Sequence, residues 1–506
     1  MKEKKGEILV VLGCLLLITL TISVAYFMAR IEGEGKNIVL KSKDLKITFT
    51  ESNLLSGTNI EPGWSKTSTF TVKNESKDTY KYNIGIKDLV NTFVTTGYLQ
   101  YKITSADGGY NMGDFKDVPK SSTQKDKVLA YSVEIAKGAT HTYSVEFKYE
   151  NSITVDQSDD MGKILSGTLF IEKGTENIFD GTWEDGTLGA KLLSDNPKVE
   201  TRTDFSTIFT TTNTGTLYKA TESIAGSTAT DVYYFAGNAA NNWVKFRGFY
   251  WRIIRTNHDG SVRLLYSGIS HDTTEGYIGT SEFNSPASDP MYAGYMYGTS
   301  GTQASNRTNE NNSTIKGVID TWYSNNLSNY SKYISTDAVY CNDREVVSGS
   351  YGEGSFGYAS YVRLDLEHSG KNSSPTYNCT NSKDAFSGSN TEAKLTYPVG
   401  LMTVDEIAYA GGVYDGKLTS PYVWYYLNSV GGSITGAQSW WLLSPEWFDS
   451  VEPWFWNVEG SKYYGMLSYS EPGWDYSVRP VISIKSDALW SSGNGSSSSP
   501  YEIVYN

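Results

Sequence analysis

Aromatic and acidic residues alternate in one segment near the carboxy terminus, residues 440–476. Twelve of its 37 residues are Trp, Tyr or Phe, against 14% aromatic residues in the whole chain, and six of the chain's 13 tryptophans lie here. The segment also carries six acidic residues and one lysine. Trp and Tyr rings supply rigid contact area, stack on sugars and serve as hot spots in protein interfaces, while carboxylates orient polar groups. The composition therefore predicts a ligand-binding surface.

We expect residues 446–476 to form a displayed loop region that contacts the ligand. Its candidate ligand-binding residues are Trp447, Phe448, Trp454, Trp456, Tyr463, Tyr464, Tyr469 and Trp474. Ordinary core packing is the alternative reading, and it suits Trp251, Trp440 and Trp441 best.

The sequence gives little support for catalysis, metal binding or nucleic-acid binding. A glycoside hydrolase would need a pair such as Glu446 and Glu471 with carboxyl groups about 5–5.5 Å or 6.5–9.5 Å apart, but acidic surface loops explain these residues more simply. Four scattered histidines and three cysteines have no metal-ligand spacing, and the net charge of −13 disfavours phosphate backbones. We expect no catalytic residue, no metal, no cofactor and no nucleic-acid partner.

The amino terminus contains 22 consecutive uncharged residues, 8–29, preceded by Lys2, Lys4 and Lys5. Such a run spans roughly 33 Å as a helix, enough for a bilayer core, and the lysines place the amino terminus in the cytoplasm. Residues 1–35 are therefore expected to be a signal anchor of a single-pass protein of the cell membrane, with its carboxy-terminal ectodomain outside. The alternative is a signal peptide cleaved near Ala25, which would make the protein secreted.

Export permits disulfides. Cys14 lies inside the hydrophobic run, which leaves Cys341 and Cys379 as the exported pair. A bond between them would close a loop of about 40 residues and stabilise the fold by about 3–4 kcal/mol. Two independent buried thiols are the alternative.

The predicted fold class is mainly β with a few helices (β and α+β). Period-two alternation over residues 36–173 predicts an antiparallel β-sandwich stalk domain. Residues 174–229, rich in Thr, Gly, Asn and Ser, are expected to be a linker with a short docking helix over 187–194. Residues 230–506 contain hairpins, one with an Asp259-Gly260 turn, and two capped helices. Ser313 begins one helix, and Thr403 with Glu406 forms a capping box for the other, which ends at Gly411.

Two resemblances add to these patterns. "SVAYFMA", "IEPGWSKTSTFTVKNES" and "DQSDDMGKILSGTLFIEKG" resemble the camelysin-like group of exported β-sandwich proteins, which includes biofilm fibre subunits of Gram-positive bacteria. This similarity implies a secreted sandwich for residues 20–173. It also implies the alternative function of a structural envelope or biofilm-fibre subunit.

The second resemblance covers about residues 185–505. The motifs are "NNWVKFRGFYWRIIRTNHDGSVRLLYSG", "CNDR", "YPVGLMTVDEIAYAGG", "SWWLLSP", "VRPVISI" and "SGNGSSSSPYEIV". They resemble a functionally uncharacterised family of exported surface proteins of Gram-positive and mollicute-related gut bacteria. The terminal part of that family looks C-type-lectin-like, the fold shared with formylglycine-generating enzymes and the variable proteins of diversity-generating retroelements.

This resemblance implies an α+β C-type-lectin-like domain over residues 230–506. Its framework residues would be Trp440, Trp441, Ser444, Pro445, Arg479 and Pro480. The triplets 452–454 and 456–458 each lack one ligand of the calcium-dependent sugar site of C-type lectins, and no cysteine follows Cys379 for formylglycine-generating chemistry. Neither activity is therefore expected.

The function that these patterns favour is a cell-surface-anchored binding protein, either an adhesin or a receptor-binding protein. Its aromatic, acidic face would contact an extracellular protein or glycan, and its amino-terminal helix would contact the membrane. The structural fibre subunit is the alternative, and the carboxylate-dependent glycoside hydrolase is a less favoured one. The sequence leaves the ligand and the oligomeric state open.

Overall fold

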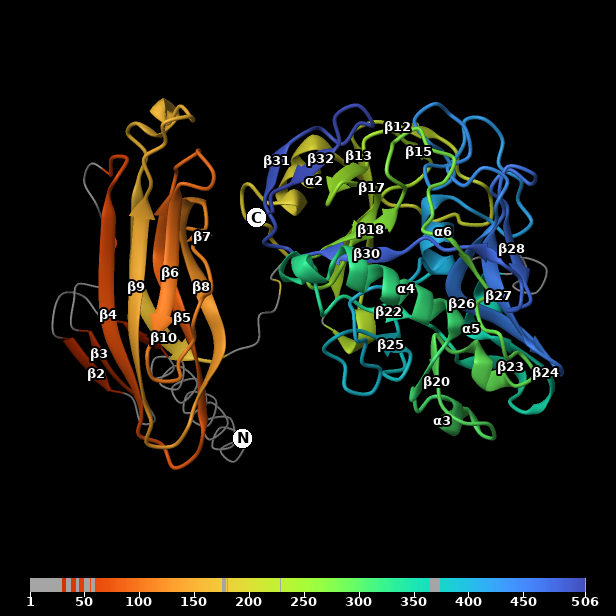
Figure 1. Cartoon of the computed structure of the whole chain (residues 1–506), viewed down its shortest axis with the longest axis horizontal. Helices are drawn as coiled ribbons and strands as arrows, with labels where there is room; N and C mark the ends of the chain where they lie inside the picture. Colours follow the sequence, from red (N-terminus) through yellow and green to blue (C-terminus); the bar gives the residue numbers. More distant parts are fainter. Residues whose placement is uncertain are drawn as a thin grey trace, which may run out of the picture. The chain divides into compact units, whose positions relative to one another are not determined.

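The structure is a computed structural model that describes residues 30–32, 38–41, 45–49, 55, 60–174, 179, 181–227, 229–364 and 374–505. The chain divides into two compact units, Met1–Ile178 and Phe179–Asn506 (Figure 1). Each unit has a hydrophobic core of its own. Both units are built mainly from β-strands, as the sequence predicts.

The first unit consists of two antiparallel sheets. One has the order β1-β10-β5-β8, with strands Arg30–Glu32, Leu165–Lys173, Tyr80–Asn91 and Ser121–Ile135. The other has the order β2-β3-β4-β9-β6-β7, with strands Ile38–Lys41, Leu45–Phe49, Ser65–Asn74, Thr140–Tyr149, Leu99–Ser105 and Lys116–Asp117. Side chains of both sheets meet in one core, because alternate residues such as Val72 and Val145 point inward.

The second unit contains a nine-stranded sheet with the path β11-β13-β14-β17-β16-β32-β31. These strands are Lys198–Glu200, Thr216–Glu222, Thr230–Tyr234, Phe249–Thr256, Trp243–Phe246, Tyr501–Ile503 and Trp490–Ser492. β18 (Val262–Tyr266) joins β17 to β30 (Val481–Ile484). The β17–β18 hairpin turns at Gly260, whose φ of +74° suits glycine, as the Asp-Gly pair predicts.

A seven-stranded sheet completes this unit, with the path β19-β29-β26-β24-β23 and with β27 joining β26 to β28. Its strands are Thr280–Ser281, Tyr476–Ser477, Trp440–Asp449, Glu353–Tyr358, Val346–Ser350, Pro453–Val458 and Leu467–Ser470. Figure 1 shows β23, β24, β26, β27 and β28 gathered at one end of the unit, opposite β31 and β32. Three two-stranded pairs are β12–β15 (Thr212–Asn213, Asn238–Ala239), β20–β21 (Met296–Tyr297, Asn311–Asn312) and β22–β25 (Tyr340–Cys341, Ala385–Phe386).

The helices of the described residues are α2 to α6: Leu188–Asp195, Gln303–Asn306, Thr314–Asn326, Ala359–Leu364 and Val404–Ala410. Ser313 caps α4 through the backbone N–H of Lys316, as predicted. Thr403 and Glu406 form the predicted capping box of α6, and Gly411 ends it with a φ of +121°.

Most of the segment predicted to be a linker, residues 174–229, is instead part of the second unit. It supplies α2 and two strands of the nine-stranded sheet, β11 and β13, and its Leu192 and Leu217 are buried in the core. The polar composition misleads because β13 buries its first three residues and leaves the remaining four, Lys219 to Glu222, half-buried or exposed. The helix predicted over 187–194 is α2, capped by Thr187.

The region 446–476, predicted to be a displayed loop, contains the end of β26 and all of β27 and β28, joined by turns. Most of the aromatic residues of β26 and β27 are buried, and Trp447 and Trp454 are the half-buried ones. No helix among the described residues has the length and apolar composition to cross a membrane. The predicted anchor, residues 8–29, lies outside the described residues.

Candidate binding site: an aromatic row on the seven-stranded sheet

Three neighbouring antiparallel strands, β26, β27 and β28, hold three of the predicted ligand contacts side by side. Trp447, Trp454 and Tyr469 are each half-buried. The ring centroids of Trp447 and Trp454 are 6.4 Å apart, and those of Trp454 and Tyr469 are 5.5 Å apart. The strand pairing fixes this arrangement, since it places Tyr469 opposite Trp456, two residues along β27 from Trp454.

Two tyrosines that the sequence interpretation missed extend these rings at both ends. Tyr361 of α5 stacks against Trp447 with centroids 6.3 Å apart and planes at 12°. Tyr414 stacks against Tyr469 at 5.8 Å and 17°. We call the five rings the aromatic row: Tyr361, Trp447, Trp454, Tyr469 and Tyr414. No local motif marks either tyrosine, because each reaches the row through tertiary packing.

A glycine in β24 makes room for the first ring of the row. Gly357 pairs with Trp447 across the ladder, and a Cβ atom added to it would lie 2.5 Å from Cδ1 of Tyr361. Contacts under 3.0 Å force a shift, so only glycine at this position lets Tyr361 lie close against the strand. In the sequence Gly357 is one of 48 glycines and does not by itself point to Tyr361.

Two predicted ligand contacts are buried and cannot reach a ligand. Trp456 has no exposed surface. Its indole Nε1 donates to Ser360 Oγ at 3.1 Å, and the edge of Tyr414 packs against it. Phe448, 6% exposed, stacks on Phe356 with centroids 5.2 Å apart. The prediction that Trp456 and Phe448 contact the ligand is therefore corrected, because both side chains pack in the core.

Three predicted contacts are exposed but lie outside the row. Tyr463 and Tyr464 occupy the turn between β27 and β28, and Trp474 occupies the turn after β28. Their side chains are 36%, 49% and 56% exposed. Trp474 contacts Tyr476 at 6.5 Å, and within the described residues none of the three makes a ring contact with the row.

The residues expected to be framework are buried. Trp440 and Trp441 are at most 1% exposed, and so is Ser444. Arg479 has no exposed surface and donates to the backbone carbonyls of Tyr266, Gly276 and Tyr425. Burial lowers the pKa of this guanidinium to about 9. These side chains support the sheet and take no part in a surface site.

The carboxylate pair considered for glycoside hydrolysis is divided between interior and surface. Glu446 is 1% exposed within β26, whereas Glu471 is half-buried just after β28. Among the described residues, no three His, Cys, Asp or Glu side chains come together in a way that could hold a metal ion.

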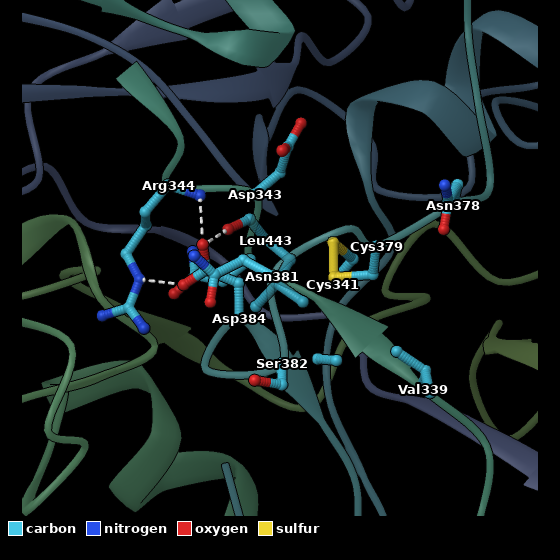
Figure 2. Close-up of a disulfide and its surroundings, with 12 residues drawn as sticks. Val339, Cys341, Asp343, Arg344, Asn378, Cys379, Asn381, Ser382, Asp384 and Leu443 are labelled. Atoms are coloured by element: carbon cyan, nitrogen blue, oxygen red, sulfur yellow. Dashed lines mark hydrogen bonds and ion pairs between the residues drawn. A yellow bond between two sulfur atoms is a disulfide. The ribbon is translucent and has the colours of Figure 1, made fainter. Parts of the chain in front are cut away.

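The predicted disulfide is present between Cys341 and Cys379, whose Cα atoms are 5.7 Å apart (Figure 2). Beside it, Figure 2 shows Arg344 bound to Asp384. The backbone N–H of Arg344 donates to Oδ2 at 2.9 Å, and its Nε donates to Oδ1 at 2.7 Å. The disulfide and this ion pair hold the 341–344 and 379–384 segments together.

A small polar cavity adjoins the disulfide. It has about 20 Å³ of room for the centre of a water molecule, and its lining residues are Arg255, Val339, Cys341, Asp343, Thr376, Tyr377, Asn378, Thr403, Asp405 and Ser444. Asp343 and Asp405 both bind Nη2 of Arg363 at 2.7 Å, and burial raises the pKa of Asp343. A cavity of this size holds little more than one water molecule, so its polar groups stabilise the fold rather than bind a ligand.

Comparisons with known proteins do not place the chain in a family. No family model matches it, and no curated protein matches it. Among solved structures, the chain is similar to Pseudomonas fluorescens alkylpurine DNA glycosylase AlkC bound to DNA containing an abasic site analog. The TM-score is 0.12 and the identity 14%, over 23% of this chain and 24% of that chain. A similarity this low carries no inference about fold or function.

Proposed function

We propose that this chain is a cell-surface binding protein that contacts an extracellular protein or glycan through the aromatic row. The observation that supports this most is the continuity of the row. Five half-buried rings from α5, β26, β27, β28 and the segment after α6 follow one another at 5.5–6.4 Å between centroids. Partly exposed Trp and Tyr rings in a contiguous patch are typical of interaction surfaces.

The rings are also held in place before any ligand arrives. Trp447, Trp454 and Tyr469 lie on paired strands, and the buried Trp456 packs beside Tyr469 with the ring centroids 6.4 Å apart. A side chain that is already ordered loses little rotamer entropy on binding, so more of its contact energy is available for affinity.

The remaining parts of the proposal come from the sequence. Residues 8–29 would anchor the chain in the cell membrane, the first unit would be the stalk, and the second would be a C-type-lectin-like binding domain. The β-rich α+β composition of the second unit is compatible with that assignment.

The test compares the same substitution at two tryptophans, Trp454 within the aromatic row and Trp474 outside it. The full chain and its Trp454→Ala and Trp474→Ala variants are screened on a glycan array and in pulldowns from extracellular protein fractions. Trp454→Ala should weaken binding of any ligand on the order of tenfold or more, since a buried aromatic hot spot contributes 2 kcal/mol or more. Trp474→Ala, which changes an exposed ring outside the row, is the matched control and should bind normally.

Thermal unfolding of both variants shows whether they remain folded. If the Trp454→Ala variant and the unmodified chain bind the ligand with equal affinity, the aromatic row is excluded as the contact site. A loss confined to Trp474→Ala would move the site to the turn after β28. No ligand in either screen would contradict the binding function itself.

A further inference from the structure

Three carboxylates border the aromatic row at one end of its strands. Asp449 ends β26, Glu452 immediately precedes β27, and Glu471 immediately follows β28. Phe455 pairs with Ser470, so the same register continued by one residue places Glu471 opposite Trp454. These three acids therefore lie next to the rings of Trp447 and Trp454.

These carboxylates repel one another and have no neutralising partner among the described residues. None of the three forms an ion pair with a lysine or arginine among the residues that the structure describes. Burial and the nearby charges of Glu471 and Asp449 raise the pKa of Glu452. Burial also acts on Asp449, but hydrogen bonds from the backbone N–H groups of Glu452 and Val451, both at 3.0 Å, outweigh it and lower the pKa of Asp449. Asp449 thus stays charged next to two further acids.

A cationic group relieves this repulsion, whereas a neutral sugar hydroxyl does not. The ring orientations favour the same ligand chemistry. Trp447 and Trp454 are tilted by 38°, and Trp454 and Tyr469 stand nearly perpendicular at 82°. The outer pairs, Tyr361–Trp447 and Tyr414–Tyr469, are nearly parallel at 12° and 17°, so the row as a whole is not one flat platform on which a chain of sugar rings would stack. A ring face that is left open can still attract a cation.

The spacing of the row suits a polypeptide. Successive centroids are 5.5–6.4 Å apart, while alternate side chains on one face of an extended peptide are about 6.8 Å apart. Successive side chains on one face of an extended peptide can therefore each contact one ring of the aromatic row. The chain's net charge of −13 also attracts a basic partner at long range.

We infer that the aromatic row and its bordering carboxylates bind an extended polypeptide segment that carries lysine or arginine side chains. This inference rests on the proposed binding function and names its ligand class. The cationic side chains lie over the rings of Trp447, Trp454 and Tyr469 and pair with Glu452 and Glu471. The affinity is therefore sensitive to salt, because part of it comes from partly exposed charges.

The experiment titrates the full chain against three probes: a fluorescent eight-residue peptide of alternating lysine and serine, the same peptide acetylated at every lysine, and cellohexaose. We expect the lysine peptide to bind, with affinity falling as salt rises, and the acetylated peptide to bind at least about tenfold more weakly. The Glu452→Gln/Glu471→Gln variant keeps side-chain size and should weaken lysine-peptide binding about tenfold.

Two further variants locate the binding. Glu275→Gln removes one charge from an exposed loop acid outside the row and should leave the affinity unchanged. Trp454→Ala should weaken binding of the lysine peptide. If the lysine peptide does not bind, if acetylation has no effect, or if the double glutamine variant binds equally well, the inference is overturned. If cellohexaose binds instead and Trp454→Ala abolishes this, the basic-peptide inference fails while the proposed function of the row stands.

Discussion

Nε of Arg263 lies 2.7 Å from Oε1 of Glu406, and neither side chain has any exposed surface. Nε of Arg255 lies 2.8 Å from the same oxygen. One carboxylate in the first turn of α6 thus joins the helix to β17 and β18. Burial lowers the pKa of Arg263, and the charge of Glu406 opposes this effect. The capping-box glutamate therefore does more than cap: it neutralises guanidinium groups in the interior of the second unit.

Removing this carboxylate should strongly destabilise the second unit. Glu406→Gln leaves two buried guanidinium groups without their anion, a change that costs about 3–5 kcal/mol. The control is Glu502→Gln, whose partner Lys245 is 42% exposed, so that its loss should cost no more than about 1 kcal/mol. Denaturant unfolding followed by tryptophan fluorescence measures both. Equal midpoints for the two variants would show that Glu406 contributes no more than a surface ion pair.

The disulfide should stabilise the second unit by constraining its unfolded state. Cys341 and Cys379 are separated by 38 residues in sequence, and closing a loop of this size contributes about 4 kcal/mol. The Cys341→Ala/Cys379→Ala variant should therefore unfold at a lower denaturant concentration. Reductant should lower the midpoint of the unmodified chain to a similar value and leave that of the variant unchanged. A midpoint insensitive to reductant in both proteins would contradict this prediction.

The first unit should lose stability as the pH falls, through His141. This residue is 5% exposed, and hydrogen bonds join its Nδ1 to Tyr82 Oη at 2.8 Å and Tyr82 Oη to Tyr143 Oη at 2.6 Å. Burial lowers the pKa of His141, and the nearby charge of Asp107 opposes this only in part. The folded-state pKa therefore lies below the unfolded value of about 6.5, and the unfolded chain binds the proton more readily.

The stabilisation is accordingly complete above about pH 6.5 and is lost as the pH falls through the folded pKa. Thermal unfolding of the first unit at pH 7.5 and pH 5.5 measures this loss. His141 is the only histidine in residues 1–178, so His141→Gln should flatten the dependence in this range. A dependence of equal size in the variant would assign it to other groups.

Gly357→Ala should weaken ligand binding although residue 357 itself need not touch the ligand. The new Cβ would lie 2.5 Å from Cδ1 of Tyr361 and would displace that ring from Trp447. We expect an affinity loss of a few-fold, on the order of 1 kcal/mol, because one of five rings is moved. Gly317→Ala on α4 is the control, since a Cβ there meets nothing within 4 Å. Binding unaffected by both changes would exclude Tyr361 from the site.

Local sequence patterns were sufficient wherever neighbouring residues decide the structure. The period-two alternation predicted strands such as β9, the Ser313 and Thr403 caps predicted where α4 and α6 begin, and Asp259-Gly260 predicted a hairpin turn. Each of these signals acts through hydrogen bonds and backbone angles within a few residues. The cysteine pair was also predictable, because Cys14 lies in the hydrophobic run and only two cysteines remained.

The sequence by itself also located the aromatic segment, but only the tertiary structure decided which rings are accessible. Trp454 and Trp456 are two residues apart in one strand, yet Ser360 and Tyr414 cover Trp456 and leave Trp454 half-buried. Tyr361 joins the row from a helix far earlier in the chain. The physical reason is that exposure depends on which distant segments pack over a side chain, and neither composition nor local periodicity contains that information.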